Sequence, residues 1–351
     1  MTNTLSRTEI AFPQGMHLVG SIPLKDTEEV LRLVSSIVGD RVRRIPDGET
    51  GDRYYWIQWQ LTFMQVAPEL ELLPADPTEY ASRPRLGVRA SHVGQKPYFP
   101  NLGYADAAKE SYQIFAQLKQ SGVIPADCRF QVSLPTPLAT VTSFIRFEDQ
   151  PLVDIAYTEA MERECERLFA TIPHHDLAVQ WDIAMEFAML EGAYPANDMY
   201  KNKAEIFKRL VALGNLIPED VELGYHLCYG DAEHKHFVEP EDTALLTEVA
   251  NAISEGVKRP VNWLHMPVPR GRKDDAYFAP LQQLRLQPST EFYLGLVHLT
   301  DGVEGTQQRV AAAQRVVPNF GVATECGMGR RTADTIPALL HVHREVTRPV
   351  R

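Results

Sequence analysis

The chain has 351 residues, of which 44% are hydrophobic and 23% are charged, a composition typical of a globular protein with a large core. Its net charge of -11 at pH 7 argues against nucleic acid or an anionic membrane surface as the main partner, so we expect small-molecule ligands. No secretory signal and no run of about 18 apolar residues is found, and a cytoplasmic location is expected. There the four cysteines stay reduced, which favours metal binding over disulfides. Whether the protein forms a homo-oligomer is left open.

Strand-like apolar runs alternate with helix-like segments along the chain. The eight expected strands are residues 16–22, 42–48, 128–134, 177–184, 221–229, 260–266, 292–299 and 320–326. Apolar residues recur at intervals of three and four in residues 26–39 and 241–256, which predicts helices there. This alternation indicates parallel strands joined by crossover helices. We therefore predict an α/β fold in which residues 1–351 form a single (β/α)8 TIM barrel.

The segment 67–106 follows the second expected strand and mixes Pro, Tyr and Arg without a clear period. We expect it to be an insertion that caps the mouth of the barrel. In such barrels the carboxyl ends of the strands carry the chemistry, so polar residues at those ends are the candidate site residues.

A histidine and a cysteine, His226 and Cys228, stand two residues apart at the end of the fifth expected strand. Residues at this spacing point to the same side of a strand, so both side chains can converge on one metal ion. Cys326 follows the eighth expected strand and precedes a glycine turn, where it can supply a second thiolate. Two thiolates and an imidazole favour zinc over magnesium or calcium. The alternative is that these are ordinary buried thiols, an interpretation preferred for Cys128 and Cys165.

Two aromatic residues and a pair of histidines near this site are expected to have structural roles. Trp181 and Tyr225 are out of phase with the inward-facing positions of their strands, so they should face the helices. His234 and His236 form a second candidate metal pair, which is discounted because it lies in a charged loop without cysteines.

Six segments together resemble the catalytic C-terminal barrel of the cobalamin-independent methionine synthase family, within the uroporphyrinogen-decarboxylase-like superfamily. They are HLVGSIPL, IPDGETGDR, SLPTPLATV, VQWDIAMEF, GYHLCYGD and ECGMGRR. In that family the last two segments carry zinc ligands. The resemblance implies a zinc-dependent methyl- or alkyltransferase that activates a small thiol such as homocysteine. It also implies a methyl-folate or another alkyl donor as co-substrate.

The resemblance implies a set of substrate-binding residues, namely Gly20, Ser21, Glu49, Asp182 and Arg330. Gly20 and Ser21 would hold a substrate carboxylate. Glu49 and Asp182 would bind a cationic amine or orient the alkyl donor, and both are also candidate catalytic groups. For Glu49, a salt bridge with Arg53 or Arg270 is an equally weighted alternative.

Two positions depart from the family pattern. The family has a glutamate zinc ligand where this chain has His265, so the expected site is His226, Cys228, His265 and Cys326. The alternative is that His265 forms a hydrogen bond in a polar pocket. The family's proton-donating histidine is replaced by Thr300, and His298, on the same strand face, is expected to act in its place.

Three functional classes follow. The favoured one is a zinc-dependent thiol alkyltransferase. The second is a zinc-dependent lyase or transferase that joins a thiol coenzyme to an epoxide or another electrophile. The third is a metal-free decarboxylase-like or binding relative.

Overall fold

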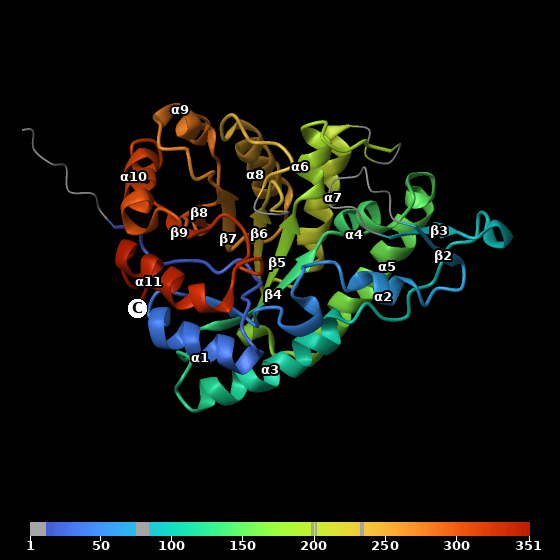
Figure 1. Ribbon diagram of the computed structural model, residues 1–351, viewed down its shortest axis with the longest axis horizontal. Helices are drawn as coiled ribbons and strands as arrows, with labels where there is room; N and C mark the ends of the chain where they lie inside the picture. The colour runs from blue at the N-terminus through green and yellow to red at the C-terminus, as the bar shows by residue number, and fades with distance from the viewer. Residues whose placement is uncertain (1–11, 75–83, 198–199, 201, 232–234) are drawn as a thin grey trace, which may run out of the picture.

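Seven parallel strands form the centre of the molecule, with helices around them (Figure 1). The computed structural model describes residues 12–74, 84–197, 200, 202–231 and 235–351. The sheet order is β1 (Arg44–Pro46), β4 (Arg129–Pro135), β5 (Leu177–Ile183), β6 (Glu222–Leu227), β7 (Trp263–Pro267), β8 (Glu291–Val297) and β9 (Gly321–Thr324). Every neighbouring pair is parallel, so all seven carboxyl ends lie at one end of the sheet. The predicted parallel α/β organisation is confirmed.

Helices connect and cover these strands. They are α1 (Thr27–Val38), α2 (Gln60–Met64), α3 (Tyr104–Gln120), α4 (Pro137–Phe144), α5 (Gln150–Thr171), α6 (Met185–Leu190), α7 (Lys203–Leu216), α8 (Ala244–Gly256), α9 (Asp275–Phe278), α10 (Gly302–Gln314) and α11 (Ile336–Val346). Helix α1 shows why the sequence folds this way locally. The Asp26 carboxylate accepts a hydrogen bond from the Glu29 amide (2.9 Å) and caps the helix, while Val30 and Val34 bury its apolar face.

The predicted first strand, residues 16–22, does not form a complete strand. Met16 makes isolated parallel bridges to the segment before β1 and to β9, so it lies between the two edges of the sheet. Further along, the carbonyl oxygen of Val19 accepts side-chain hydrogen bonds from Ser133 (2.9 Å) and Gln180 (2.6 Å). Because side chains satisfy the backbone there, no ladder continues. The barrel prediction is confirmed in part, as a curled seven-stranded parallel sheet with isolated bridges in place of an eighth strand.

The predicted insertion contains an antiparallel hairpin of β2 (Leu70–Leu73) and β3 (Arg85–Val88). In Figure 1 the hairpin lies at one end of the molecule, far from α10. Residues 75–83 of the insertion lie outside the described part of the chain. Arg85 lines the cavity described below, and the capping role of the whole segment stays a prediction.

A buried ion-pair network closes the amino-terminal end of the sheet. Arg44, whose side chain is 3% exposed, donates hydrogen bonds to Glu222 and to Glu291 (2.8 Å to Oε2). Its guanidinium carbon lies 4.2 Å from the ring centroid of Trp263. These four residues are the first of β1, β6, β8 and β7. The network therefore lies at the opposite end of the sheet from the carboxyl ends that carry the candidate site.

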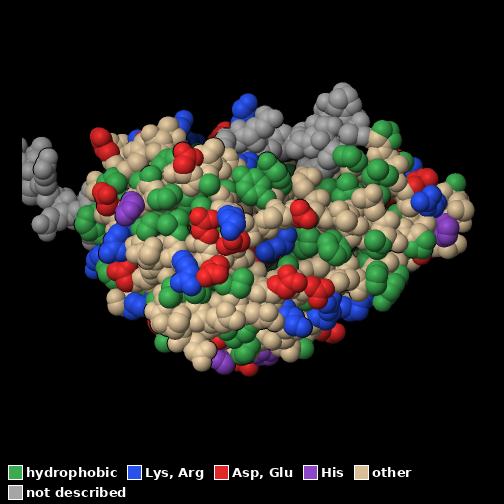
Figure 2. All heavy atoms as spheres, turned by 60° about the horizontal axis from the view of Figure 1, so that its bottom comes forward, with side chains coloured by type: hydrophobic (Ala, Val, Ile, Leu, Met, Phe, Trp, Pro, Cys, Tyr) green, Lys and Arg blue, Asp and Glu red, His purple; other side chains and the backbone are tan. Residues whose placement is uncertain are grey.

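On the face drawn in Figure 2, acidic and basic side chains are interspersed and do not form patches of one sign. Within the part of the chain that the structure describes, no helix has the length and apolarity needed to span a membrane.

Candidate active site

Strands β5 and β6 place an acid and an imidazole side by side. Asp182 and His226 are direct partners in the strand register, and both are buried. The residues between the inward positions face the helices, since Trp181 donates to the carbonyl of Leu213 (3.2 Å) and Tyr225 to that of Leu210 (2.9 Å). Both carbonyls belong to α7. The predicted alternation along these two strands is confirmed.

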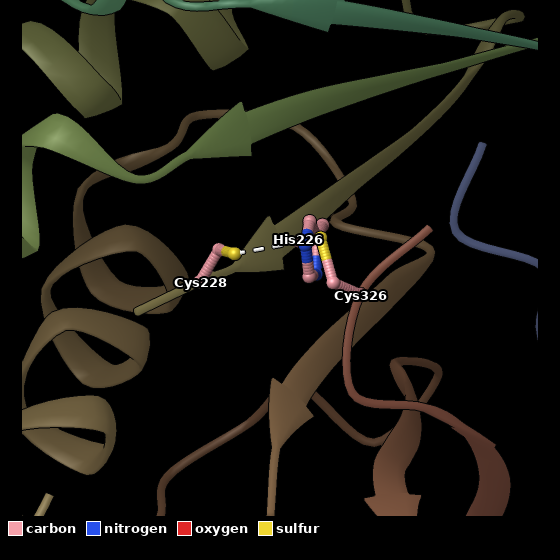
Figure 3. Close-up of side chains that lie close together, drawn as sticks. All are labelled: His226, Cys228 and Cys326. Atoms are coloured by element: carbon pink, nitrogen blue, oxygen red, sulfur yellow. Dashed lines mark hydrogen bonds between the residues drawn. The ribbon is translucent and has the colours of Figure 1, made fainter. Parts of the chain in front are cut away.

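Two cysteines join His226 beyond the strand ends (Figure 3). Cys228 follows β6 by one residue and Cys326 follows β9 by two. Their sulfur atoms are 3.7 Å apart, and one ligand atom from each of the three residues lies within 4.8 Å of the others. A hydrogen bond with Cys326 lowers the pKa of Cys228, and the nearby imidazole of His226 lowers it further. Cys228 therefore loses its proton before Cys326 does.

His265 lies behind His226 and is not among these three clustered residues. The two histidines are partners across β6 and β7, and their Nδ1 atoms are 2.7 Å apart. Burial lowers the pKa of His265 well below its usual value, so this ring is neutral. Nε2 of His226 is buried and has no hydrogen-bond partner among the described residues. When Nδ1 of His226 donates to His265, Nε2 carries the lone pair that a metal ion requires.

Two carboxyl groups form a second wall of the site. Ser21 donates a hydrogen bond to Glu49, and Gln180 donates one to Asp182 (2.8 Å). Burial and the nearby charge of Asp182 raise the pKa of Glu49 to about 8, and burial raises that of Asp182 to about 7. Arg53 contacts Asp47 (2.7 Å), and Glu49 forms no salt bridge with Arg53 or Arg270, so that alternative is wrong.

The backbone around these acids is closely packed. Glu49 has φ 49° and Trp56 has φ 55°, a region that L-residues rarely adopt, and both residues line the cavity. The turn after Cys326 approaches Ser21, since the Met328 amide donates to the Ser21 carbonyl (2.7 Å). A Cβ added at Gly329 would lie 2.9 Å from Ser21 Cβ, so this approach requires glycine.

A cavity of about 530 Å³ joins the sulfur cluster to the acidic wall. Of the predicted site residues, it brings together Gly20, Ser21, Glu49, Asp182, His226, Cys228, Cys326 and Arg330. Arg330 forms an ion pair with Asp231 at this cavity (3.0 Å). Sequence reasoning missed a group of cavity-lining residues from outside the seven-stranded sheet, namely Tyr54, Tyr55, Trp56, Arg85, Phe147, Tyr194 and Phe237. The run Tyr54–Tyr55–Trp56, directly after the segment holding Glu49, is the signal that could have found three of them.

His298 does not line this cavity. Its Nε2 atom donates to the carbonyl of Val268 (2.9 Å), and its Nδ1 atom lies 3.6 Å from Glu325. Burial, together with the charge of Arg309, lowers the pKa of His298 to about 3. The structure therefore places the predicted proton donor, as a neutral imidazole, outside the cavity wall.

Glu325 also contacts His236 (3.2 Å), so this histidine has a structural partner. His234, the other member of the discounted pair, lies outside the described residues. Cys128 and Cys165 are buried, and burial raises the pKa of each to about 12, as expected for thiols without a chemical role.

The raised pKa values of the two acids predict a pH-dependent stability. Glu49 and Asp182 bind protons more tightly in the folded chain than in the unfolded chain. Their contribution is therefore complete below about pH 4 and is lost as the pH rises through about 7 to 8. We expect the free energy of unfolding of metal-free protein to fall by about 4 kcal/mol or more across this range, as measured by urea titration. Glu49→Gln should flatten the decline, whereas Asp52→Asn, an exposed neighbour, should leave it unchanged. Equal slopes in all three proteins would contradict this assignment.

The fold has relatives among solved structures. No family model and no curated protein matches the chain. A protein from Listeria monocytogenes, named as a candidate vitamin-B12-independent methionine synthase, is similar over 96% of this chain and 98% of its own, with 13% identity and a TM-score of 0.54. A protein named as a methyltransferase from Methanosarcina mazei is similar over 95% of this chain and 94% of its own, with 12% identity and a TM-score of 0.53. At this identity the likeness shows a shared TIM-barrel-like fold, which extends over nearly the whole of each chain.

Proposed function

We propose that this protein is a zinc-dependent transferase that moves a methyl or another alkyl group onto a small thiol. The observation that carries this proposal is the convergence of His226, Cys228 and Cys326 in the wall of a cavity large enough for substrates. The likeness of the fold to proteins named methionine synthase and methyltransferase supports the same class of reaction.

The donor set fits zinc. Two sulfur atoms and an imidazole nitrogen are ligands that zinc prefers. Nε2 of His226 is buried and has no hydrogen-bond partner among the described residues, so a metal ion would satisfy it. Three protein ligands leave a coordination position for a substrate sulfur. When bound, zinc lowers the pKa of such a thiol and presents it as a thiolate near neutral pH.

The remaining residues have roles that follow from their positions. His265 holds the ring of His226 through the Nδ1 contact and selects its tautomer. Gln180 orients Asp182, and Ser21 orients Glu49, so that both carboxyl groups are available to a cationic group of a substrate. Asp182, His226 and Cys228 are buried in the cavity wall, where a low local dielectric strengthens these interactions.

The test is a comparison of zinc-loaded and zinc-depleted protein. We expect about one zinc per chain by elemental analysis. We also expect alkylation of a thiol such as homocysteine that is lost on chelation and restored by zinc but not by magnesium. Protein that is purified without chelator and holds no zinc would contradict the proposal. So would alkylation that is unaffected by complete zinc removal.

A His265→Ala variant distinguishes a supporting residue from a zinc ligand. If His265 only orients His226, zinc affinity should fall about 10- to 100-fold, measured by competition with a chromophoric chelator. His343→Ala removes a buried histidine that donates to the Leu339 carbonyl (2.8 Å) in α11, and it should leave zinc affinity unchanged. If His265→Ala lowered zinc affinity as much as a cysteine variant does, His265 would be the fourth ligand. If zinc affinity did not change, His265 would have no role in the site.

A further inference from the structure

An aromatic segment forms one side of the cavity. Three consecutive residues line it, namely Tyr54, Tyr55 and Trp56. The rings of the two tyrosines pack edge to face, with their centroids 4.6 Å apart. Trp56 is held in a left-handed backbone conformation, with φ 55°. Strained backbone of this kind costs free energy and is often found at ligand-binding segments. The electron-rich faces of such rings attract cations.

The two acids on the acidic wall of the same cavity lack salt bridges within the described part of the chain. Neither Glu49 nor Asp182 forms an ion pair with any described residue, although both line the cavity. Arg330 is matched by Asp231, and Arg85, on the hairpin side, donates to the carbonyl of Ile145 (3.2 Å). Carboxyl groups placed beside aromatic rings, without a salt bridge to an arginine or lysine, favour a positively charged ligand.

The position of His298 bears on the leaving group. An alkyl donor that leaves as an anion has to be protonated as it departs. The predicted proton donor, His298, lies outside the cavity, so this proton would have to come from Glu49 or Asp182, the carboxyl groups that line it. A sulfonium or quaternary ammonium donor needs no proton. The substrate thiolate attacks the methyl carbon and a new sulfur–carbon bond forms. The electron pair of the broken bond stays on the departing sulfur or nitrogen, which leaves as a neutral sulfide or amine.

We propose that the alkyl donor is an onium ion, a sulfonium or quaternary ammonium compound, whose cationic group binds between residues 54–56 and the carboxyl groups of Glu49 and Asp182. This inference rests on the proposed function, because it names the donor for the same reaction. It adds a recognition mode, in which the aromatic segment selects the charge of the donor and the acids stabilise it in the cavity.

The test is a binding measurement that requires no turnover. Choline and its neutral isostere 3,3-dimethylbutan-1-ol differ only in the charge of the trimethyl group. We expect the full-length, zinc-loaded protein to bind choline at least about tenfold more tightly, by calorimetry. Trp56→Leu and Glu49→Gln should each reduce this preference severalfold. Trp59→Leu is the matched control, because Trp59 packs on Phe63 and Tyr104 and does not line the cavity. Equal binding of the two compounds would overturn the inference.

An activity assay separates this inference from the proposed function. Zinc-loaded protein should methylate homocysteine with S-methylmethionine as the donor. Methylation by a methyl-folate, together with no preference for choline, would overturn the onium donor and leave the thiol transferase intact. A protein that prefers choline but holds no zinc and alkylates no thiol would overturn the proposed function, while the cation site itself would stand.

Discussion

Replacing either Cys228 or Cys326 with serine is expected to abolish stoichiometric zinc binding and thiol alkylation. A serine hydroxyl stays protonated at neutral pH, so each substitution removes one anionic sulfur ligand. Zinc sites built from four protein ligands bind with about 10 to 16 kcal/mol at pH 7. One ligand therefore accounts for roughly 3 kcal/mol, or more than a hundredfold in affinity. Elemental analysis after dialysis and chelator competition would measure the loss.

Cys128→Ser is the matched control for these two variants. Cys128 is buried and takes no part in the three-residue cluster, so this variant should retain zinc and activity if it folds. Circular dichroism of all three variants would separate loss of the site from loss of the fold. Full zinc occupancy in Cys228→Ser or Cys326→Ser would refute the assigned ligands.

Arg44→Met is expected to lower the free energy of unfolding by about 1–3 kcal/mol, because it removes the buried partner that Glu222 and Glu291 share and leaves them, within the described chain, only their ion pairs with Arg129 and Arg43. Urea denaturation at pH 7 would measure the change. The neighbouring Arg43→Met is the control. Arg43 contacts Glu291 (2.7 Å), but its side chain is 41% exposed, so its loss should cost less than about 1 kcal/mol.

A compensating variant tests the cause of this loss. Adding Glu222→Gln and Glu291→Gln to Arg44→Met removes the two carboxylates that have lost their buried partner and should recover part of the lost stability. If the triple variant were no more stable than Arg44→Met, packing of the arginine side chain against Trp263 would account for the effect in place of the ion pairs. A loss below about 1 kcal/mol in Arg44→Met would contradict the role of the network.

Much of the fold could be read from the sequence, because the signals are local. The seven strands of the sheet were predicted within a few residues, since apolar runs and helical periodicity alternate along the chain. The convergence of His226, Cys228 and Cys326 was predicted from strand alternation and strand-end position, which fix the direction of a side chain. The facing of Trp181 and Tyr225 towards α7 followed from the same period of two.

Other features depend on contacts between distant segments. Residues 16–22 were predicted as a strand from their apolar pattern, but side chains from β4 and β5 satisfy the Val19 carbonyl and replace the ladder. His265 was aligned with a zinc ligand of the family. In the structure it contacts His226 and is not part of the cluster of His226, Cys228 and Cys326. His298 was expected to replace the proton donor, but it follows the end of β8, its ring hydrogen-bonds to the Val268 carbonyl and it does not line the cavity.

The sequence by itself determined the parallel α/β fold and the triad of one imidazole and two thiols, because strand periodicity and ligand chemistry are properties of short segments. Only the tertiary structure decided which residues surround that triad. The aromatic segment 54–56, the partnership of Arg53 with Asp47 and the closing network of Arg44 are set by the packing of irregular loops and strand ends. No local period encodes such packing, since it follows from which segments meet when the sheet curls.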